Sequence, residues 1–342
     1  MKLLALILFI AQACAPVMTV EEHQDNGQVI IRESGKRVLQ YNYRTVFEED
    51  VIRAENKRDV QFVYAKVEGV YYDEYLKAHP GLEKNDTTTS RIYAVPRSDY
   101  IHPLYGLNGE ILTCDWPDGG HPHHRGIFWA WPEVDYQSER GDIYALQRVF
   151  ARPTGHVNYT NGSSFARIEA ENLWLWENRK PIVREQVTIT AYRSTGESRV
   201  IDLTIAMEAI GDEVKVATRF TNSYGGLNVR METPQKQTIS YHTDSVGLLP
   251  RRAWADFSGL FEGNQSESGL TILQHQSNPE YPGQWVEYPD LSWVQPTFPT
   301  PETRYPISHG KPLVLRYRFI VHQGGQPDAG ISAKRWDTYH AE

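Results

Sequence analysis

Alternation of polar and apolar residues is the feature of this sequence that most constrains its fold. Along residues 199–205 and 315–321 every second side chain is apolar, which is the period of a β-strand with one buried and one exposed face. Helical spacing is weak and short, at 74–78 and 329–337. The alternating segments 199–205 and 315–321 belong to longer strand-like stretches at 199–209 and 313–322. The other strand-like stretches are 28–31, 38–43, 61–67, 91–95, 111–114, 127–131, 164–175, 182–192, 213–222 and 270–275. The pattern therefore predicts antiparallel sheet through most of the chain.

The scarcity of helices decides between the possible layer architectures. Because β and α units do not alternate, the sequence argues against a doubly wound sheet or an α/β barrel and favours an all-β fold, a large antiparallel β-sandwich or jelly roll. No linker, repeat or change of composition divides the chain, so residues 31–340 are predicted to form a single domain after a flexible lead at 16–30. Residues 68–90 are expected to form a polar excursion or lid. The Pro-rich residues 276–312 are expected to form a long ordered loop.

The beginning of the chain predicts export. Lys2 precedes an apolar run too short to span a bilayer, which indicates a signal peptide at residues 1–15. The residues before Cys14 also fit a bacterial lipoprotein signal, so a lipid tether at Cys14 is a hypothesis beside ordinary cleavage. We therefore expect a periplasmic, outer-membrane-anchored or secreted bacterial protein. Cys114 is the other of the two cysteines, so no intrachain disulfide is expected to support the fold.

Charge and aromatic content narrow the class of partner. The 342 residues carry a formal net charge of -8 without any Lys/Arg-rich run, so a nucleic-acid partner is not expected. The 20 Tyr and 9 Trp residues suit pleated sheets and can also stack against sugar faces. An acidic chain can still bind an anionic small substrate, because a few arginines in a pocket set the local potential.

The candidate site is a cluster of histidines beside arginines. Four of the 12 histidines fall in two Gly/Pro-framed loops, and they are His102, His121, His123 and His124. Imidazole exchanges a proton near neutrality, with an unperturbed pKa of about 6.5, and it is also the commonest metal ligand. Because Pro122 holds the chain extended, His121 and His123 are expected to project to one side and His124 to the other.

The group of histidines is more informative than any one of them. A single His is more often a capped, packed or solvated residue than a functional one, but several of them beside Arg97 and Arg125 are hard to explain by packing alone. Neither a Cys ligand nor a His-Glu-x-x-His helix accompanies them, so acid/base chemistry is favoured and no metal cofactor is expected. A hard divalent ion such as Ca²⁺, held by oxygen ligands, stays an open alternative.

The histidine motif carries a resemblance to a known family. The segments 100–106 and 121–131, including His-Pro-His-His-Arg-Gly, resemble the PmoA-like family of unknown function, and the resemblance extends over nearly the whole mature chain. Further matching segments are 199–202, 225–231, 254–259, 275–279 and 315–318. This sequence departs from the family pattern at Gly120 and Gln274, where an Asp commonly precedes a histidine.

The resemblance implies both a fold and a biological context. The fold would be a sandwich similar to the supersandwich of the galactose-mutarotase-like proteins, in exported bacterial proteins linked to polysaccharide breakdown. An oligosaccharide or polysaccharide is then the expected substrate. The two missing acidic residues weaken the case for a metal site further, since such residues bind metals or orient imidazoles.

A sugar-handling sandwich with His and Arg at one site suggests β-elimination at a uronate, by a dehydratase or a lyase. An arginine would neutralise the carboxylate and a neutral imidazole, His123 by preference or His102, would take the C5 proton. Tyr100, Tyr105 or a second His would protonate the departing oxygen. The candidate substrate contacts are Arg97, His121, His124, Arg125, Trp129, Arg230, His242 and His275.

Three other functions stay open. A glycoside hydrolase would need two opposed carboxylates, and neither Glu133 with Asp135 nor Glu169 with Glu171 has a distinctive context. A sugar epimerase would use the same His/Arg set without a leaving group. A non-catalytic carbohydrate-binding protein would stack tryptophans on sugars, but it has no need of several imidazoles.

Overall fold

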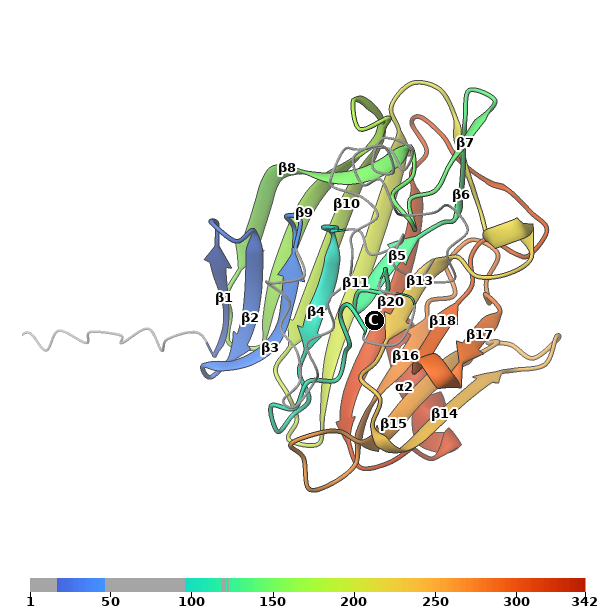
Figure 1. The fold of residues 1–342 in the computed structure, drawn as a ribbon. Helices are drawn as coiled ribbons and strands as arrows, with labels where there is room; N and C mark the ends of the chain where they lie inside the picture. Colours follow the sequence, from blue (N-terminus) through green and yellow to red (C-terminus); the bar gives the residue numbers. More distant parts are fainter. Residues whose placement is uncertain (1–16, 47–95, 118–120, 122, 342) are drawn as a thin grey trace, which may run out of the picture.

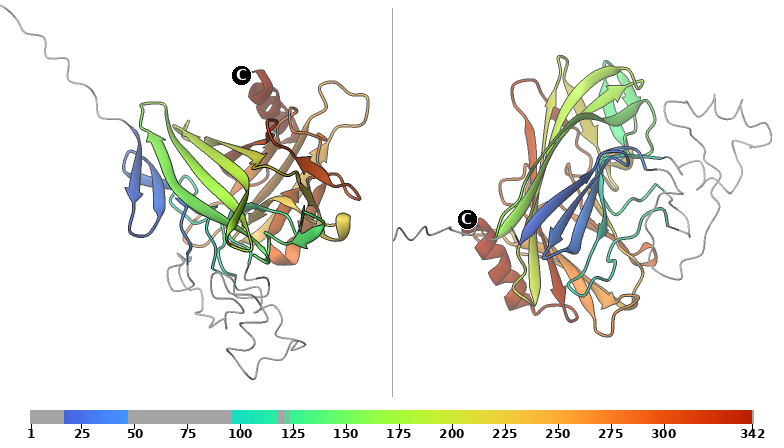
Figure 2. Two further views of the ribbon diagram at one scale, coloured as in Figure 1. Left: turned by 90° about the horizontal axis from the view of Figure 1, so that it is seen from above. Right: turned by 90° about the vertical axis from the view of Figure 1, so that its left-hand side faces the viewer.

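The computed structural model describes residues 17–46, 96–117, 121 and 123–341. In this part of the chain two large antiparallel sheets pack face to face, with a small third sheet at one end (Figures 1 and 2). The all-β sandwich expected from the alternating pattern is therefore confirmed. None of the helices in the described ranges is long and apolar enough to cross a membrane.

We call the first eight-stranded sheet the front sheet. Its strands, in spatial order, are β1 (Met18–His23), β2 (Gln28–Glu33), β3 (Lys36–Asn42), β4 (Tyr100–Leu104), β5 (Ile127–Ala130), β13 (Gly226–Arg230), β18 (Trp293–Pro296) and β17 (Trp285–Tyr288). All of its pairings between named strands are antiparallel.

The second eight-stranded sheet is the back sheet. Its strands, in spatial order, are β14 (Gln235–Thr243), β15 (Ala253–Leu260), β16 (Ser268–Gln274), β20 (Leu313–Gln323), β11 (Ser198–Ala209), β10 (Lys180–Tyr192), β9 (Phe165–Trp176) and β8 (Val149–Thr160). The small sheet consists of β19 (Tyr305–Ile307), β12 (Val214–Ala217), β6 (Glu133–Tyr136) and β7 (Glu139–Gly141). Within the described ranges the helices are the single-turn η3 (Arg219–Thr221) and η4 (Pro289–Leu291) and the longer α2 (Ala329–Ala341).

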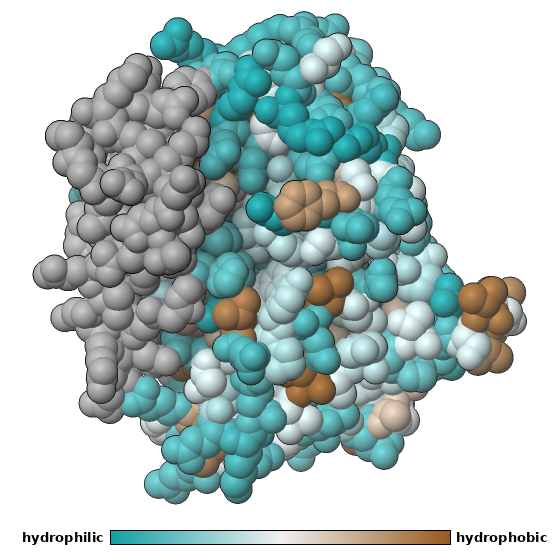
Figure 3. Space-filling model, turned by 45° about the vertical axis from the view of Figure 1, so that its right-hand side comes forward, coloured by the Kyte–Doolittle hydropathy of each residue, from teal (hydrophilic) through white to brown (hydrophobic). Residues whose placement is uncertain are grey.

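Burial follows the alternation that the sequence shows. Along β11 buried and half-buried side chains alternate without a break, and the buried ones join the core between the two sheets. A second, smaller apolar cluster lies where α2 packs against the outer face of the back sheet, around Trp254 and Trp336. The described surface in Figure 3 is mostly hydrophilic, and the most exposed large apolar side chains are Leu249, Val246 and Phe220.

Several expected elements have other boundaries or conformations. The segment predicted as a flexible lead at 16–30 instead contains β1 and the start of β2, because Met18 and Val20 turn inward and β2 supplies a full antiparallel partner. The stretch 111–114 makes only isolated bridges, and 213–222 forms β12 followed by η3. The predicted loop 276–312 contains β17, β18 and β19. The stretches 61–67, 68–90, 74–78 and 91–95, and the signal peptide with Cys14, lie outside the described residues.

A buried polar network joins the two sheets. Tyr41 of β3 donates its hydroxyl to Asp99 at 2.7 Å, and Asn172 of β9 donates to Asp99 at 2.9 Å and to Glu185 of β10 at 3.1 Å. Trp174 donates its indole N–H to Glu185 at 2.9 Å. Burial and the neighbouring Glu185 raise the pKa of Asp99 well above its usual value, so Asp99 keeps its proton in the folded protein.

The raised pKa of Asp99 gives the stability a pH dependence with a definite sign. The folded protein retains a proton on Asp99 that the unfolded chain loses above the ordinary aspartate pKa of 3.8, so this contribution to stability is lost as pH rises from there through the raised pKa. Asp99→Asn replaces the protonated acid by a neutral amide and should remove that loss. Urea unfolding from pH 5 to pH 9 should show the wild type losing stability relative to Asp99→Asn, by up to about 1.4 kcal/mol per pH unit. Parallel curves for the two proteins would contradict a retained proton on Asp99. Asp25→Asn in the exposed β1–β2 turn serves as the control.

Candidate functional site

The candidate site lies on the face of the front sheet that points away from the back sheet. The strand register places Trp129 of β5 on the inner face, so its neighbour Phe128 points outward. Asn228 of β13 lies opposite Phe128 and shares that outer face. Arg230, two residues further on, and its cross-strand partner Trp293 of β18 extend the same face.

Backbone hydrogen bonds hold the histidine segment over this face. The N–H of His124 donates to the carbonyl of His121 at 3.0 Å, and the N–H of Trp116 donates to the carbonyl of His124 at 3.3 Å. Gly126 donates to the carbonyl of Cys114 and accepts from Arg230, each at 2.8 Å. Gly126 has φ +59°, and a Cβ there would lie 2.3 Å from the carbonyl oxygen of Ile101, so only glycine fits this position.

The three imidazoles gather on one side. The ring centroids of His123 and His124 are 4.7 Å apart, and those of His121 lie 5.6 Å and 5.1 Å from them. The expected alternation of side chains is therefore not what the structure shows. His121 has a left-handed backbone with φ +51°, and the turn that it begins brings His124 beside the other two.

Two buried arginines flank these rings. The guanidinium of Arg97 lies 4.9 Å from the ring centroid of Phe128, and its Nη1 donates to the carbonyl of Tyr144 at 3.4 Å. Arg97 and Arg230 are only 2% and 5% exposed. Nε of Arg97, and Nε and Nη1 of Arg230, have no hydrogen-bond partner among the described residues, and neither arginine forms a salt bridge there. Buried donors of this kind are uncommon without a ligand or water.

Burial and positive neighbours keep the imidazoles neutral. Burial lowers the pKa of His123 and of His124 well below the usual value, and the adjacent histidines and arginines lower it further. The pKa of His121 is lowered by burial and by Arg230. Burial, with Arg125 nearby, lowers the pKa of Arg97 to about 10, so it is still charged at neutral pH. The site therefore combines neutral bases with two arginines that form no salt bridge among the described residues.

Aromatic residues that the sequence did not single out complete the site. Tyr144 contacts the rings of His123 and His124 at centroid distances of 5.3 Å and 6.0 Å, and its hydroxyl lies 3.2 Å from Oδ1 of Asn228. The ring of Trp293 stacks on His124 at 5.6 Å. These residues come from a loop and from a distant strand, and no local motif marks them. Only the three-dimensional register brings them to the histidines.

Arg125 and Tyr100 occupy a different, structural position. Arg125 is fully buried and forms an ion pair with Asp115, and its Nη2 also donates to the hydroxyl of Tyr100 at 2.7 Å. That hydroxyl donates to Asp115 at 2.9 Å, and the guanidinium packs 4.4 Å from the ring centroid of Trp116. The donors of this arginine and this tyrosine are thus largely committed to Asp115. They support the loop that carries the histidines.

The remaining sequence candidates are spread over the molecule. Nδ1 of His102 lies 3.0 Å from the hydroxyl of Thr113, and the hydroxyl of Tyr105 accepts from Arg37 in a separate groove. Trp129 is buried in the core.

The last two candidates belong to the back sheet. His242 stacks on Trp254 at 4.3 Å, and its Nε2 lies 2.8 Å from Asp244. His275 stacks on His340 of α2 at 4.6 Å. Gln274 uses its amide to bond both backbone groups of Gly283, which gives it a structural role. Gly120 lies outside the described residues.

Comparison with known families identifies the family to which the chain belongs. The model of a family of unknown function (DUF6807) matches residues 84–337, which include the histidine segment and nearly all of both sheets' later strands. The protein belongs to the DUF6807 family. The curated proteins contain no match to it. Among the described residues of this DUF6807 protein, no group of three or more His, Cys, Asp or Glu side chains is arranged to hold a metal ion.

In this DUF6807 protein Arg125 has an acidic partner and Arg230 does not form a salt bridge among the described residues. Measurements of unfolding free energy can test this contrast. Arg230→Met removes a buried charge without an acidic hydrogen-bond partner and should raise the free energy of unfolding. Arg125→Met leaves Asp115 buried and unpaired and should lower it by about 3–5 kcal/mol. Denaturant unfolding of both variants beside the wild type measures the difference. Equal losses in the two variants would show that Arg230 is a structural residue.

Proposed function

We propose that this protein is a PmoA-like, carbohydrate-active enzyme that catalyses β-elimination at a uronate of an acidic oligosaccharide. The observation that carries the proposal is the set of buried N–H donors of Arg97 and Arg230 that have no partner among the described residues, around three neutral imidazoles. A carboxylate matches those donors in charge and geometry. A neutral imidazole beside it can act as a base at once, because it need not first lose a proton.

The proposed reaction starts with the carboxylate. Arg97 and Arg230 bind it and stabilise the enediolate that forms when the C5–H bond breaks. His123 takes the C5 proton on its imidazole. The electron pair of that bond then forms the C4=C5 double bond, and the C4–O bond breaks with its pair remaining on the departing oxygen. No oxidant or reductant is needed.

The departing oxygen needs a proton, and Tyr144 is the proposed donor. We prefer Tyr144 to the other two tyrosines as the proton donor. The hydroxyl of Tyr100 donates to Asp115, and Tyr105 lies in another groove. Burial raises the pKa of Tyr144 well above its usual value, so the hydroxyl is protonated at any working pH. If the leaving group is a sugar the enzyme is a lyase, and if it is water the enzyme is a dehydratase.

Elimination is tested by the ultraviolet absorbance of the 4,5-unsaturated product. Uronic-acid oligosaccharides with the wild type should give rising absorbance, and His123→Ala should lower kcat at least about 10²-fold. His156→Ala is the matched control, because His156 is exposed on β8 and remote in sequence from the site. New reducing ends without absorbance would favour a hydrolase instead. Activity that EDTA removes and a divalent ion restores would overturn the metal-free mechanism.

The role of Tyr144 has a separate test. Tyr144→Phe keeps the ring contacts with the two histidines but loses the proton donor, so kcat should fall about 10²–10⁴-fold with little change in KM. Tyr224→Phe, an aromatic neighbour 5.2 Å from the Tyr144 ring, is the control. A leaving group that needs no protonation should rescue Tyr144→Phe. Unchanged kcat in Tyr144→Phe would remove this residue from the mechanism.

A further inference from the structure

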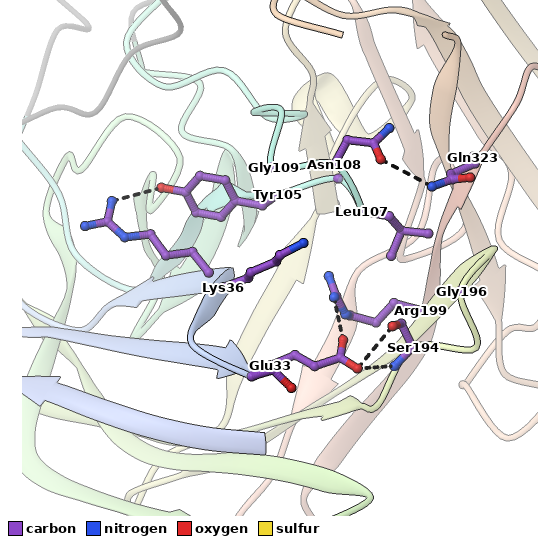
Figure 4. A pocket seen from close by; sticks show the side chains of 13 residues that line it. Glu33, Lys36, Tyr105, Leu107, Asn108, Gly109, Ser194, Gly196, Arg199 and Gln323 are labelled. Atoms are coloured by element: carbon purple, nitrogen blue, oxygen red, sulfur yellow. Dashed lines mark hydrogen bonds and ion pairs between the residues drawn. The ribbon is translucent and has the colours of Figure 1, made fainter. Parts of the chain in front are cut away.

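A cavity that is separate from the histidine site lies at the end of the sandwich where the β2–β3 turn meets the back sheet. Its volume is about 630 Å³, and its walls come from residues 33–37, the loop 105–109, the β10–β11 turn and the end of β20 (Figure 4). None of the residues around the three imidazoles lines it. The volume is in the range of sites that hold a small organic ligand and exceeds what a simple ion requires.

The floor of this groove holds a buried arginine with spare donors. Arg199 is 5% exposed, and its Nη2 donates to Glu33 at 2.7 Å. Its Nε and Nη1 have no partner among the described residues. Glu33 is itself occupied, since it accepts from the N–H and the hydroxyl of Ser194, each at 3.1 Å. Although burial alone would raise it, the pKa of Glu33 is held below its usual value by Arg199 and Ser194.

The rim of the groove carries two further cations and two side-chain amides. Lys36 and Arg37 are exposed on the rim, so the charged residues lining the groove are three cations and one acid. On the opposite side the amides of Asn108 and Gln323 face each other, with 3.4 Å between Nε2 of Gln323 and Oδ1 of Asn108 (Figure 4). Amides of this kind can exchange hydrogen bonds with hydroxyl groups.

The groove also has an apolar wall. Tyr105 lines it with its ring and holds Arg37 through its hydroxyl at 3.3 Å, and Leu107 lies further along the wall (Figure 4). A ligand with an anionic group, hydroxyls and an apolar face would satisfy all of these surfaces. An inorganic anion would use only the cations and leave the amides and the wall uncovered.

We infer that this groove is a second binding site, for a sugar unit that carries an oxyanion. The oxyanion meets the positive charges of Arg199 and Lys36, which both line the groove, the sugar hydroxyls meet the amides, and the ring lies against Tyr105. The inference stands on the groove alone and does not depend on elimination at the histidines. The protein would then bind an acidic glycan at a sugar unit other than the one that reacts at the histidines.

The test measures binding with the histidine site disabled. In a His123→Ala, Arg230→Met background, a saturated glucuronic-acid trisaccharide is titrated by calorimetry, and binding should remain. Adding Lys36→Glu should weaken it at least about ten-fold, because a charge-assisted contact becomes repulsive. Lys334→Glu on the exposed face of α2 makes the same charge change away from the groove and should leave the affinity unchanged.

Two comparison ligands decide the chemistry. A neutral glucose trisaccharide should bind at least about ten-fold more weakly than the glucuronic-acid trisaccharide, and inorganic sulfate should also bind more weakly. Sulfate binding as tightly as the trisaccharide would overturn the sugar part of the inference. Absence of trisaccharide binding in the background variant, or equal effects of Lys36→Glu and Lys334→Glu, would overturn the site itself. Circular dichroism confirms that each variant is folded.

Discussion

The buried hydrogen bonds that Asp99 accepts from Tyr41 and Asn172 are the interaction on which the geometry of the histidine site rests. These hydrogen bonds run from Tyr41 in the front sheet to Asn172 in the back sheet, so they fix one layer against the other in a core that is otherwise apolar. Buried polar groups specify an arrangement because any other register would leave them unsatisfied. Asp99 stands just before β4, two residues after Arg97. The contact that joins the sheets therefore also positions the first arginine of the site.

The arginines of the histidine region divide into two kinds by their partners. Arg125 faces a carboxylate, and its charge is used within the fold to hold the loop. Arg97 and Arg230 lie beside imidazoles and aromatic rings and form no salt bridge among the described residues, and a buried charge without a salt bridge is costly for the free protein. A fold tolerates such a cost where a ligand supplies the missing charge. Arg199 is an intermediate case. It is buried like these arginines, but Glu33 accepts a hydrogen bond from one of its donors.

The fold was more predictable from the sequence than the site was. Alternation is a local property, so β9, β10, β11 and β20 were found with boundaries close to those observed. The sequence also marks the histidine segment, because its composition is unusual by itself. It does not predict the conformation of that segment, since the left-handed turn at His121 cannot be read from an X-Pro dipeptide. It does not mark Tyr144 and Trp293, and it suggests Arg125 as a ligand contact, because partners set by cross-strand register leave no trace in local sequence.

The overall charge makes the local arrangement of cations more important. A protein with a net charge of -8 repels an acidic glycan at long range, so binding depends on cations that are buried or clustered. Arg97 and Arg230 meet this need at the histidines, where low exposure limits screening by salt. Lys36 and Arg37 lie on an exposed rim, where salt screens them within about 10 Å at 0.1 M. Binding at the groove should thus weaken with salt more steeply than binding at the histidines. A glycan that spans both would be held at one end by a salt-sensitive contact and at the other by a salt-resistant one.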